Sequence, residues 1–200
     1  MKIFLDTAVF EDIDKANQTG LIDGVTTNPS LILKSGGDPV ETIKKISGEF
    51  PFFESISAEV VADEALEMVN QAQSFKDLKN VTIKVPLTVE GLKACKLLTQ
   101  DGFTVNVTLC FSVAQAVLAA KAGATYISPF VGRVDDNSFE GLGLVKDISN
   151  LYKEHMSRTQ VLAASLRNVK DVAQCFSVGA DVVTMPPAIF HKMYNHILTD

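Results

Sequence analysis

The sequence predicts a single-domain α/β protein folded as a closed (β/α)8 barrel over residues 1–200. Eight short runs rich in β-branched and other apolar residues recur along the chain, and each is followed by a stretch with helical spacing of apolar residues. Such alternation is typical of a parallel sheet covered by helices, and eight strands close a barrel. An open doubly wound sheet is the alternative, but no Gly-x-Gly-x-x-Gly follows the first run, which weakens its dinucleotide-binding version.

The elements can be placed in order along the chain. The expected strands cover residues 2–7, 24–28, 52–60, 81–87, 103–110, 126–131, 161–165 and 181–185. Apolar residues at three- and four-residue spacing predict helices at 64–69, 89–99 and 113–121, after the third, fourth and fifth strands. Gly102, Gly123 and Gly179 follow helical stretches, at positions where a left-handed residue commonly ends a helix.

Composition favours one compact domain without a nucleic-acid partner. The hydrophobic fraction of 46% is ample for a core, and 200 residues leave no room for a second domain beside a barrel. The formal net charge is −6, and no cluster of Lys and Arg is present to neutralise a phosphate backbone.

The cysteines and the hydropathy pattern predict a cytoplasmic protein with no membrane partner. Cys95, Cys110 and Cys175 are widely spaced and form no Cys-x-x-Cys pair, which indicates reduced thiols and neither a disulfide framework nor a metal site. No basic N-terminal segment precedes an apolar stretch, and no apolar run approaches membrane-spanning length.

A charged residue interrupts the fourth expected strand, Val81-Thr82-Ile83-Lys84-Val85-Pro86. Burying an ammonium is costly unless it is paired or its pKa falls. A lysine that attacks carbonyls must be neutral, so a buried lysine is a candidate nucleophile. The alternatives are a side chain that reaches solvent or one that pairs with a carboxylate.

Polar residues lie at the carboxyl ends of seven of the eight expected strands, where barrels of this kind collect their chemistry. Each has an ordinary structural explanation: Asp6 and Ser165 are suited to capping helices, and Thr26 and Asn28 to shaping the turn before Pro29. Their coincidence at one rim favours an active site. The residues are Asp6, Thr26, Thr27, Asn28, Glu59, Lys84, Asn106, Thr108, Ser128, Arg133, Ser165 and Arg167.

An anion site is predicted at the ends of the sixth and seventh strands. Arg133 and Arg167 can present planar guanidinium forks to a phosphate, and Ser165 adds a hydroxyl. Surface ion pairs are the alternative for each arginine, and Asp135 and Asp136 are close in sequence to Arg133.

Seven motifs, spread from the first strand to the seventh in order, resemble those of one family. They are FLDT, GVTTNPSL, SAEV, IKVP, NVTLCFS, SPFVGR and AASLRN. Together they are similar to the transaldolases, particularly the small subfamily that includes the fructose-6-phosphate aldolases. The resemblance covers nearly the whole chain and implies a cofactor-free transfer of a dihydroxyacetone unit between sugar phosphates of the pentose phosphate pathway.

The resemblance implies a role for each matching residue. Lys84 matches the lysine that forms a Schiff base with the ketose, and Asp6 matches the acid/base at the C4 hydroxyl of the sugar. Glu59 and Thr108 match the pair that holds a catalytic water. The substrate-binding residues implied are Thr26, Asn28, Asn106, Ser128 and Phe130, with Arg133, Ser165 and Arg167 as the phosphate ligands.

Two positions favour transferase over aldolase within this family. Glu59 stands where the resembling aldolases have glutamine, and Phe130 where they have tyrosine. A tyrosine hydroxyl could position the water that releases the bound triose, whereas phenylalanine leaves that face dry. Fructose-6-phosphate aldolase is the alternative, and a non-catalytic sugar-phosphate binding barrel, with Lys84 merely paired to Glu59 or Asp6, is the less favoured one.

The resemblance also implies a homo-oligomer, a pentamer or a decamer. We expect the chain to reach Asp200 inside the helix after the eighth strand, with a C-terminal helical tail shorter than that of the relatives.

Overall fold

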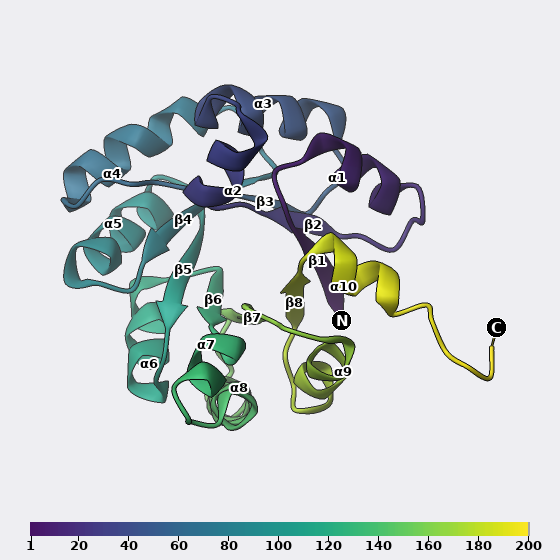
Figure 1. Ribbon diagram of the computed structural model, residues 1–200. Helices are drawn as coiled ribbons and strands as arrows, with labels where there is room; N and C mark the ends of the chain where they lie inside the picture. Colours follow the sequence, from purple (N-terminus) through teal and green to yellow (C-terminus); the bar gives the residue numbers. More distant parts are fainter. Residues whose placement is uncertain (200) are drawn as a thin grey trace.

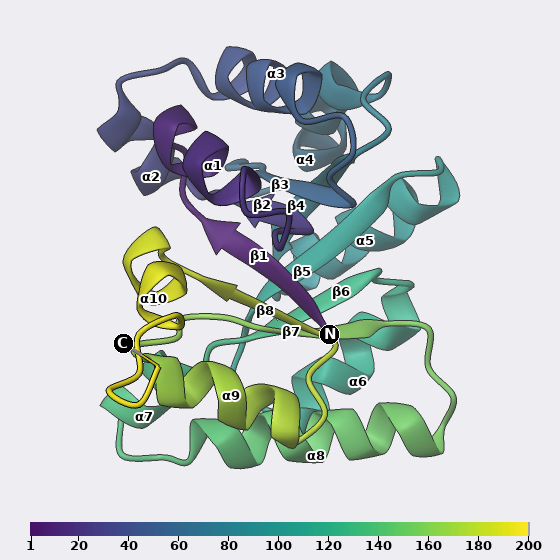
Figure 2. The same ribbon diagram turned by 90° about the vertical axis from the view of Figure 1, so that its right-hand side faces the viewer.

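The computed structural model describes residues 1–199 and forms a closed barrel of parallel strands in the order β1 to β8, with β1 also paired to β8 (Figure 1). Helices lie outside the strands on all sides (Figure 2). The elements are β1 Lys2–Asp6, α1 Phe10–Asn17, β2 Gly24–Thr26, α2 Pro29–Ser35, α3 Pro39–Glu49, β3 Ser55–Glu59, α4 Ala65–Ala72, a 3-10 turn Gln73–Phe75, β4 Val81–Pro86, α5 Val89–Gln100, β5 Thr104–Cys110, α6 Val113–Ala122, β6 Tyr126–Pro129, α7 Val131–Asp136, α8 Gly141–Glu154, β7 Gln160–Ala163, α9 Val169–Ser177, β8 Val182–Met185 and α10 Pro187–Lys192.

Each strand divides its side chains between the barrel interior and the layer beneath the helices, because successive residues of a strand point to opposite faces. In β3, Ile56 and Ala58 join the large apolar core under the helices. Ser55 and Ser57 alternate with them, and Ser55 donates a hydrogen bond to Thr82 of β4. The interior on the β3–β5 side is therefore lined with hydroxyls.

Side chains from β1, β6, β7 and β8 also form an apolar cluster in the interior. Phe4, Tyr126, Leu162 and Val182 form a separate buried cluster with Ala164. Gly24 of β2 makes room for this cluster, since a Cβ there would lie 2.9 Å from the Phe4 ring. The interior thus contains a packed apolar cluster beside hydroxyl-bearing side chains.

All eight strands are confirmed, and their edges differ from the expected ones for local reasons. The third strand begins at Ser55, not at residue 52, because Phe53 N–H donates to the Phe50 carbonyl and closes a turn. The second strand ends at Thr26, since Asn28 begins α2 as its N-cap. The sixth ends at Pro129, and the residue after Phe130 already belongs to α7.

The expectation that a helix extends to the end of the chain is wrong for residues 193–199. Helix α10 ends at Lys192, and the segment that follows contains turns (Figure 1). Asp200 lies outside the described residues. In the part of the chain that the structure describes, no helix combines the length and the apolar character needed to cross a membrane.

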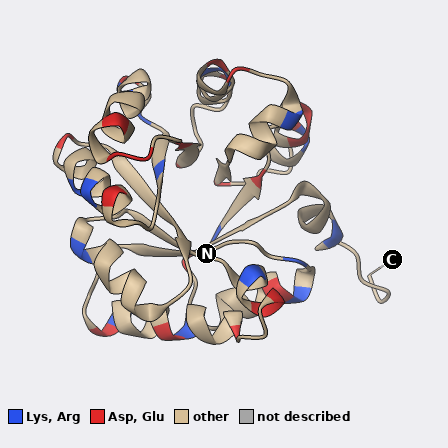
Figure 3. Cartoon of the chain, turned by 60° about the vertical axis from the view of Figure 1, so that its left-hand side comes forward, with Lys and Arg blue, Asp and Glu red and all other residues tan. Residues whose placement is uncertain are grey.

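Charged residues belong mainly to the helices and the connecting loops, while most of each strand has none (Figure 3). This distribution is the one expected of a barrel whose strands are covered on their outer face. The few charged residues of the strands are therefore the informative ones.

Candidate active site

Lys84 lies inside the barrel, near the carboxyl end of β4. Its Nζ is 2.9 Å from Glu59 Oε2 and donates to the Thr27 carbonyl oxygen at 3.2 Å. Glu59 ends β3 and is the register partner of Lys84, so the two side chains meet at the rim. The Lys84 side chain is 10% exposed, which rules out a side chain that simply reaches solvent. An ammonium has three N–H groups, so this one keeps a donor for a ligand.

Asp6 ends β1 and faces the same space. Its Oδ1 accepts a hydrogen bond from Thr26 Oγ1 at 2.7 Å, and Thr26 Oγ1 lies 2.6 Å from Thr184 Oγ1. Burial raises the pKa of the Asp6 carboxyl above its ordinary value, and the negative charge of Glu59 acts in the same direction. The hydrogen bond from Thr26 and the charge of Lys84 oppose this shift without cancelling it. A carboxyl with a raised pKa in a cleft is suited to exchanging protons with a substrate.

Two polar side chains of β5 point into this space with atoms unpaired. Ser128 Oγ donates to Asn106 Oδ1 at 2.8 Å, which fixes the amide and leaves its Nδ2 free. Asn106 Nδ2 and Thr108 Oγ1 are buried and have no hydrogen-bond partner within residues 1–199. An unpaired buried polar atom costs free energy, so these two atoms are suited to binding hydroxyl groups of a ligand.

Phe130 and Arg133 form the wall at the end of β6. The Arg133 guanidinium carbon lies 5.1 Å from the centre of the Phe130 ring, a cation–π arrangement. Gly132 lets this wall lie against the segment after β7: its N–H donates to the Ser165 carbonyl at 3.1 Å, and a Cβ there would be 2.2 Å from that oxygen. Arg133 makes no ion pair with any described residue, so the surface-pair alternative is wrong for it.

Arg167 has a different environment. Its Nη2 lies 2.6 Å from Asp136 Oδ2, and both side chains are more than half exposed, at 55% and 58%. Arg167 is not among the residues that line the cavity described below. The structure therefore brings Arg133 and Ser165 to the site, whereas Arg167 has the surface ion pair that was its alternative.

The capping alternatives have mixed outcomes. Asn28 does cap α2, because its Oδ1 accepts from Leu31 N–H at 3.0 Å, and it lines the cavity as well. Asp6 does not cap the following helix, since the N-cap of α1 is Val9 and no side chain caps it. Ser165 does not cap α9, whose N-cap is Asn168.

A cavity of about 160 Å³ connects these side chains at the carboxyl end of the barrel. Glu59 and Thr27, the two partners of Lys84, are not among its lining residues. Three lining residues were not predicted from the sequence, namely Leu162, Ala164 and Thr184. They could have been identified from the last two strands, because every second residue of a strand points into the barrel. The full lining is Asp6, Thr26, Asn28, Lys84, Asn106, Thr108, Ser128, Phe130, Arg133, Leu162, Ala164, Ser165 and Thr184.

Two residues beside the cavity have strained backbones. Leu109 (φ 64°) and Ser165 (φ 62°) adopt the left-handed region, which is uncommon for residues with side chains. Leu109 lies where the register between β5 and β6 shifts, next to Thr108. Such strain clusters at functional sites, and here it flanks both the polar side chains of β5 and the predicted anion site.

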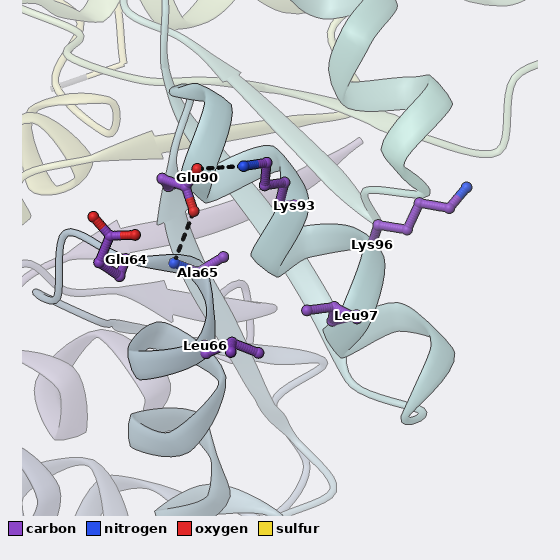
Figure 4. Close-up of a pocket in the computed structure, with 7 residues that line it drawn as sticks. All are labelled: Glu64, Ala65, Leu66, Glu90, Lys93, Lys96 and Leu97. Carbon is purple, nitrogen blue, oxygen red and sulfur yellow. Dashed lines mark hydrogen bonds and ion pairs between the residues drawn. The ribbon is translucent and has the colours of Figure 1, made fainter.

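A larger hollow on the outside of the barrel, of about 550 Å³, does not compete as an active site (Figure 4). It lies between α4 and α5, and Leu66 and Leu97 are part of its wall. Two carboxylates, Glu64 and Glu90, are among its lining residues, and Glu90 is already engaged, because it accepts from Lys93 Nζ at 2.6 Å and from Ala65 N–H at 3.2 Å. The smaller cavity has convergent polar groups, which are the better indication of a binding site.

The described residues include no group of three or more His, Cys, Asp and Glu side chains that could hold a metal ion. Cys95, Cys110 and Cys175 are free and buried, and burial raises the pKa of each thiol to about 12. None of the three is therefore a reactive thiolate.

Fold and site together define a class of protein. A buried lysine beside two carboxylates, opening on a polar cavity at the carboxyl end of a (β/α)8 barrel, is the arrangement of a barrel enzyme.

Comparison with known proteins narrows this class. The family model described as Transaldolase/Fructose-6-phosphate aldolase matches residues 3–200, and the chain belongs to this family. A protein of Paracoccus denitrificans named probable transaldolase is 52% identical, with 100% of this chain and 92% of that protein covered. A probable transaldolase of Cereibacter sphaeroides is also 52% identical, with coverage of 100% and 91%.

A solved structure described as "Native KDPGal structure" shares the fold. The TM-score is 0.66 over 92% of this chain and 80% of that one, at 16% sequence identity. At this identity the likeness confirms the barrel architecture and nothing finer.

Proposed function

We propose that this protein is a transaldolase, which transfers a dihydroxyacetone unit from fructose 6-phosphate or sedoheptulose 7-phosphate to an aldose phosphate through a Schiff base on Lys84. The observation that supports this most directly is the position of Lys84, with its Nζ 2.9 Å from Glu59 and exposed to a cavity that Asp6 also lines. The family match and the relatives named probable transaldolase support the same reaction class.

The first half of the reaction forms the imine. Glu59 takes a proton from the Lys84 ammonium, and the neutral amine attacks C2 of the ketose. Loss of the C2 oxygen as water gives the protonated imine, with Glu59 and Thr108 holding the water that carries protons. Asn106 Nδ2 and Thr108 Oγ1, which have no partner among residues 1–199, are available for substrate hydroxyls and this water.

The second half breaks and remakes a carbon–carbon bond. Asp6 removes the proton of the C4 hydroxyl, the C3–C4 bond breaks, and its electron pair moves into the iminium to give an enamine. The aldehyde leaves, with glyceraldehyde 3-phosphate as the product from fructose 6-phosphate. An acceptor such as erythrose 4-phosphate then takes the three-carbon unit by the reverse steps, and hydrolysis of the new imine restores the free lysine.

Arg133 and Ser165 are proposed to bind the substrate phosphate, with Arg167 joining them by exchanging Asp136 for the phosphate. Support comes from Arg133, which lines the cavity beside Ser165 and forms no ion pair with the described residues. A guanidinium without a carboxylate partner is suited to binding a phosphate dianion.

Cellular context follows from this proposal. Sugar-phosphate substrates indicate the pentose phosphate pathway, and we propose a cytoplasmic enzyme, which the three free, buried cysteines support. We also propose a homo-oligomer, and exposed apolar side chains such as Leu33 and Phe139 support it.

Two other functions remain as candidates. A fructose-6-phosphate aldolase would use the same lysine and belongs to the same family, but Phe130 lines the cavity without a hydroxyl that could hold a releasing water. A non-catalytic binding barrel would keep Lys84 paired with Glu59, as it is here. Such a barrel has no use for a carboxyl like Asp6, whose burial raises its pKa.

Borohydride reduction in the presence of fructose 6-phosphate tests the proposal. We expect a reduced sugar adduct on the peptide that contains Lys84, identified by mass, and no adduct in Lys84→Met, whose thioether fills similar volume without an amine. An adduct on another lysine, or none in the unmodified protein, would overturn the Schiff-base assignment. Release of dihydroxyacetone without an acceptor would favour the aldolase.

A further inference from the structure

A buried chain of hydroxyls leads from β8 to the Asp6 carboxyl. Thr184 Oγ1 lies 2.6 Å from Thr26 Oγ1, which donates to Asp6 Oδ1 at 2.7 Å. The two threonines are 4% and 3% exposed. Strand β1 lies between β2 and β8, so the side chains of both neighbours can reach the space above Asp6. Thr184 also lines the cavity, and no step of the reaction above uses it.

The protons available to these three side chains determine which group donates in each hydrogen bond. A hydroxyl has one proton to donate, and an ionised carboxylate can only accept. When Asp6 is ionised, Thr26 must give its proton to Oδ1, so the 2.6 Å contact requires Thr184 to donate to Thr26. When Asp6 carries a proton on Oδ1, the chain can run the other way, with Asp6 donating to Thr26 and Thr26 to Thr184.

We propose that Thr184 is a positioning residue for Asp6: it donates to Thr26, holds the Thr26 hydroxyl in line with Oδ1, and so leaves Oδ2 to take the C4 hydroxyl proton of the substrate. This inference rests on the proposed function, because Asp6 needs this orientation only if it exchanges a proton with the sugar. Hydrogen bonds in a chain polarise one another, so donation by Thr184 strengthens the Thr26 bond to the carboxylate.

The other groups around Asp6 show why this support matters. Burial raises the pKa of Asp6, and the negative charge of Glu59 on β3 adds to the effect. The hydrogen bond from Thr26 is the largest opposing influence, followed by the charge of Lys84 on β4. Loss of Thr184 weakens the Thr26 bond, so the pKa of Asp6 should rise further, and the base form should be lost at a higher pH than in the unmodified enzyme.

A purely structural role for Thr184 is the competing explanation, since β-branched residues commonly fill barrel interiors. Thr184→Val distinguishes the structural role from the positioning role, because valine keeps the shape of the side chain and removes the hydrogen-bond donor. Thr184→Ser keeps the donor and reduces the volume. Thr82→Val is a matched control: Thr82 is a buried interior threonine that accepts from Ser55 at 2.8 Å and has no hydrogen bond to the Asp6 chain.

The experiment measures kcat and KM for transfer as a function of pH. For Thr184→Val we expect kcat to fall about 3- to 10-fold with little change in KM, the scale of one weakened hydrogen bond in the transition state. The acidic limb of the kcat profile should move to higher pH, and Thr184→Ser should restore both kcat and the limb. Thr82→Val should leave the limb in place even where it lowers the melting temperature.

Several outcomes would overturn the inference. One is an acidic limb of the kcat profile that is the same in Thr184→Val as in the unmodified enzyme. Another is an acidic limb that moves as far in Thr184→Ser as in Thr184→Val. If Thr184→Val does not fold, Thr184→Ala carries the same test. Failure of the proposed function looks different, because the unmodified enzyme would then give no borohydride adduct on Lys84, whatever the Thr184 variants do.

Discussion

Two lysines enter the barrel from opposite ends and have different surroundings. Lys2, at the start of β1, has its Nζ 2.5 Å from Glu54 and donates to Gln160 Oε1 at 2.9 Å. Lys84, near the end of β4, is paired with Glu59 at 2.9 Å. Both are paired with a carboxylate, so ion pairing alone does not distinguish a structural lysine from a reactive one.

The polar atoms around each lysine do distinguish them. At the amino end, the Tyr126 hydroxyl donates to Glu54 Oε1 at 3.0 Å, and burial raises the pKa of Tyr126, so this hydroxyl stays a donor. At the carboxyl end, Asn106 Nδ2 and Thr108 Oγ1 are buried with no partner among the described residues. The satisfied network closes one end of the barrel, and the unsatisfied one leaves the other end suited to a ligand.

Replacing each lysine by methionine should have the most different effects at the two ends of the barrel. Lys84→Met should abolish turnover and borohydride trapping, since no other lysine is among the residues that line the cavity. Lys2→Met should keep trapping and turnover and lose about 1 kcal/mol of stability or less, because its carboxylate partner is partly exposed. Turnover, adduct mass and thermal melting decide it.

A loss of trapping in Lys2→Met that matches the loss in Lys84→Met would contradict the distinction between the two ends. Far-UV circular dichroism of both variants separates loss of chemistry from loss of fold.

The two arginines at the carboxyl end should differ in their effect on substrate binding. Arg133→Ala should lower the affinity for phosphorylated substrates by about one to two orders of magnitude, which is the range expected for the loss of one charge-assisted hydrogen bond. Arg167→Ala should lower this affinity less, because Arg167 must first leave Asp136 before it can bind a phosphate. The KM values for phosphorylated and unphosphorylated acceptors measure the difference.

Asp136→Asn is the matched control for the arginine pair. It frees Arg167 from its partner, so the KM for a phosphorylated substrate should fall or stay unchanged. Equal losses in Arg133→Ala for both kinds of acceptor would mean that Arg133 is structural.

Asp6 gives the carboxyl end a pH-dependent stability. Because burial raises the pKa of Asp6 in the folded state, its contribution to stability is complete below the unfolded-state pKa and is lost as the pH rises through the folded-state pKa. Asp6→Asn cannot ionise, so it should melt at a higher temperature than the unmodified protein at pH 7 while losing its activity. The advantage should shrink toward about pH 4. A variant that is less stable at pH 7 would contradict this.

The sequence predicted the barrel because alternation and strand number depend on local pattern alone. The sequence also predicted that four polar residues lie at one rim, since the carboxyl ends of parallel strands share one end of a barrel. These residues are Lys84, Asp6, Asn106 and Thr108, and all four line the cavity. The third strand was predicted to begin three residues too early because Phe53 is apolar in a turn as well as in a strand.

Side-chain partners were beyond the sequence pattern. Nothing local indicates that Arg167 contacts Asp136, 31 positions earlier, and not the cavity. Thr184 was missed for a related reason: a threonine in an apolar strand is an ordinary core residue until the closure of β8 onto β1 places it 2.6 Å from Thr26.

Phe130→Tyr makes the smallest expected change and tests the carboxyl end most finely. The Phe130 ring lines the cavity, with Arg133 over its face and the Phe111 ring packed edge-on at 5.9 Å. A tyrosine adds one hydroxyl that can hold a water near the enamine, so release of free dihydroxyacetone should rise about two- to fivefold and transfer to erythrose 4-phosphate should fall. Phe111→Tyr is the control, because Phe111 touches Phe130 without lining this cavity, and it should leave both rates unchanged. Triose release measured with and without the acceptor decides the matter: equal release by the unmodified protein and by Phe130→Tyr would mean that the phenyl ring does not keep water from the intermediate.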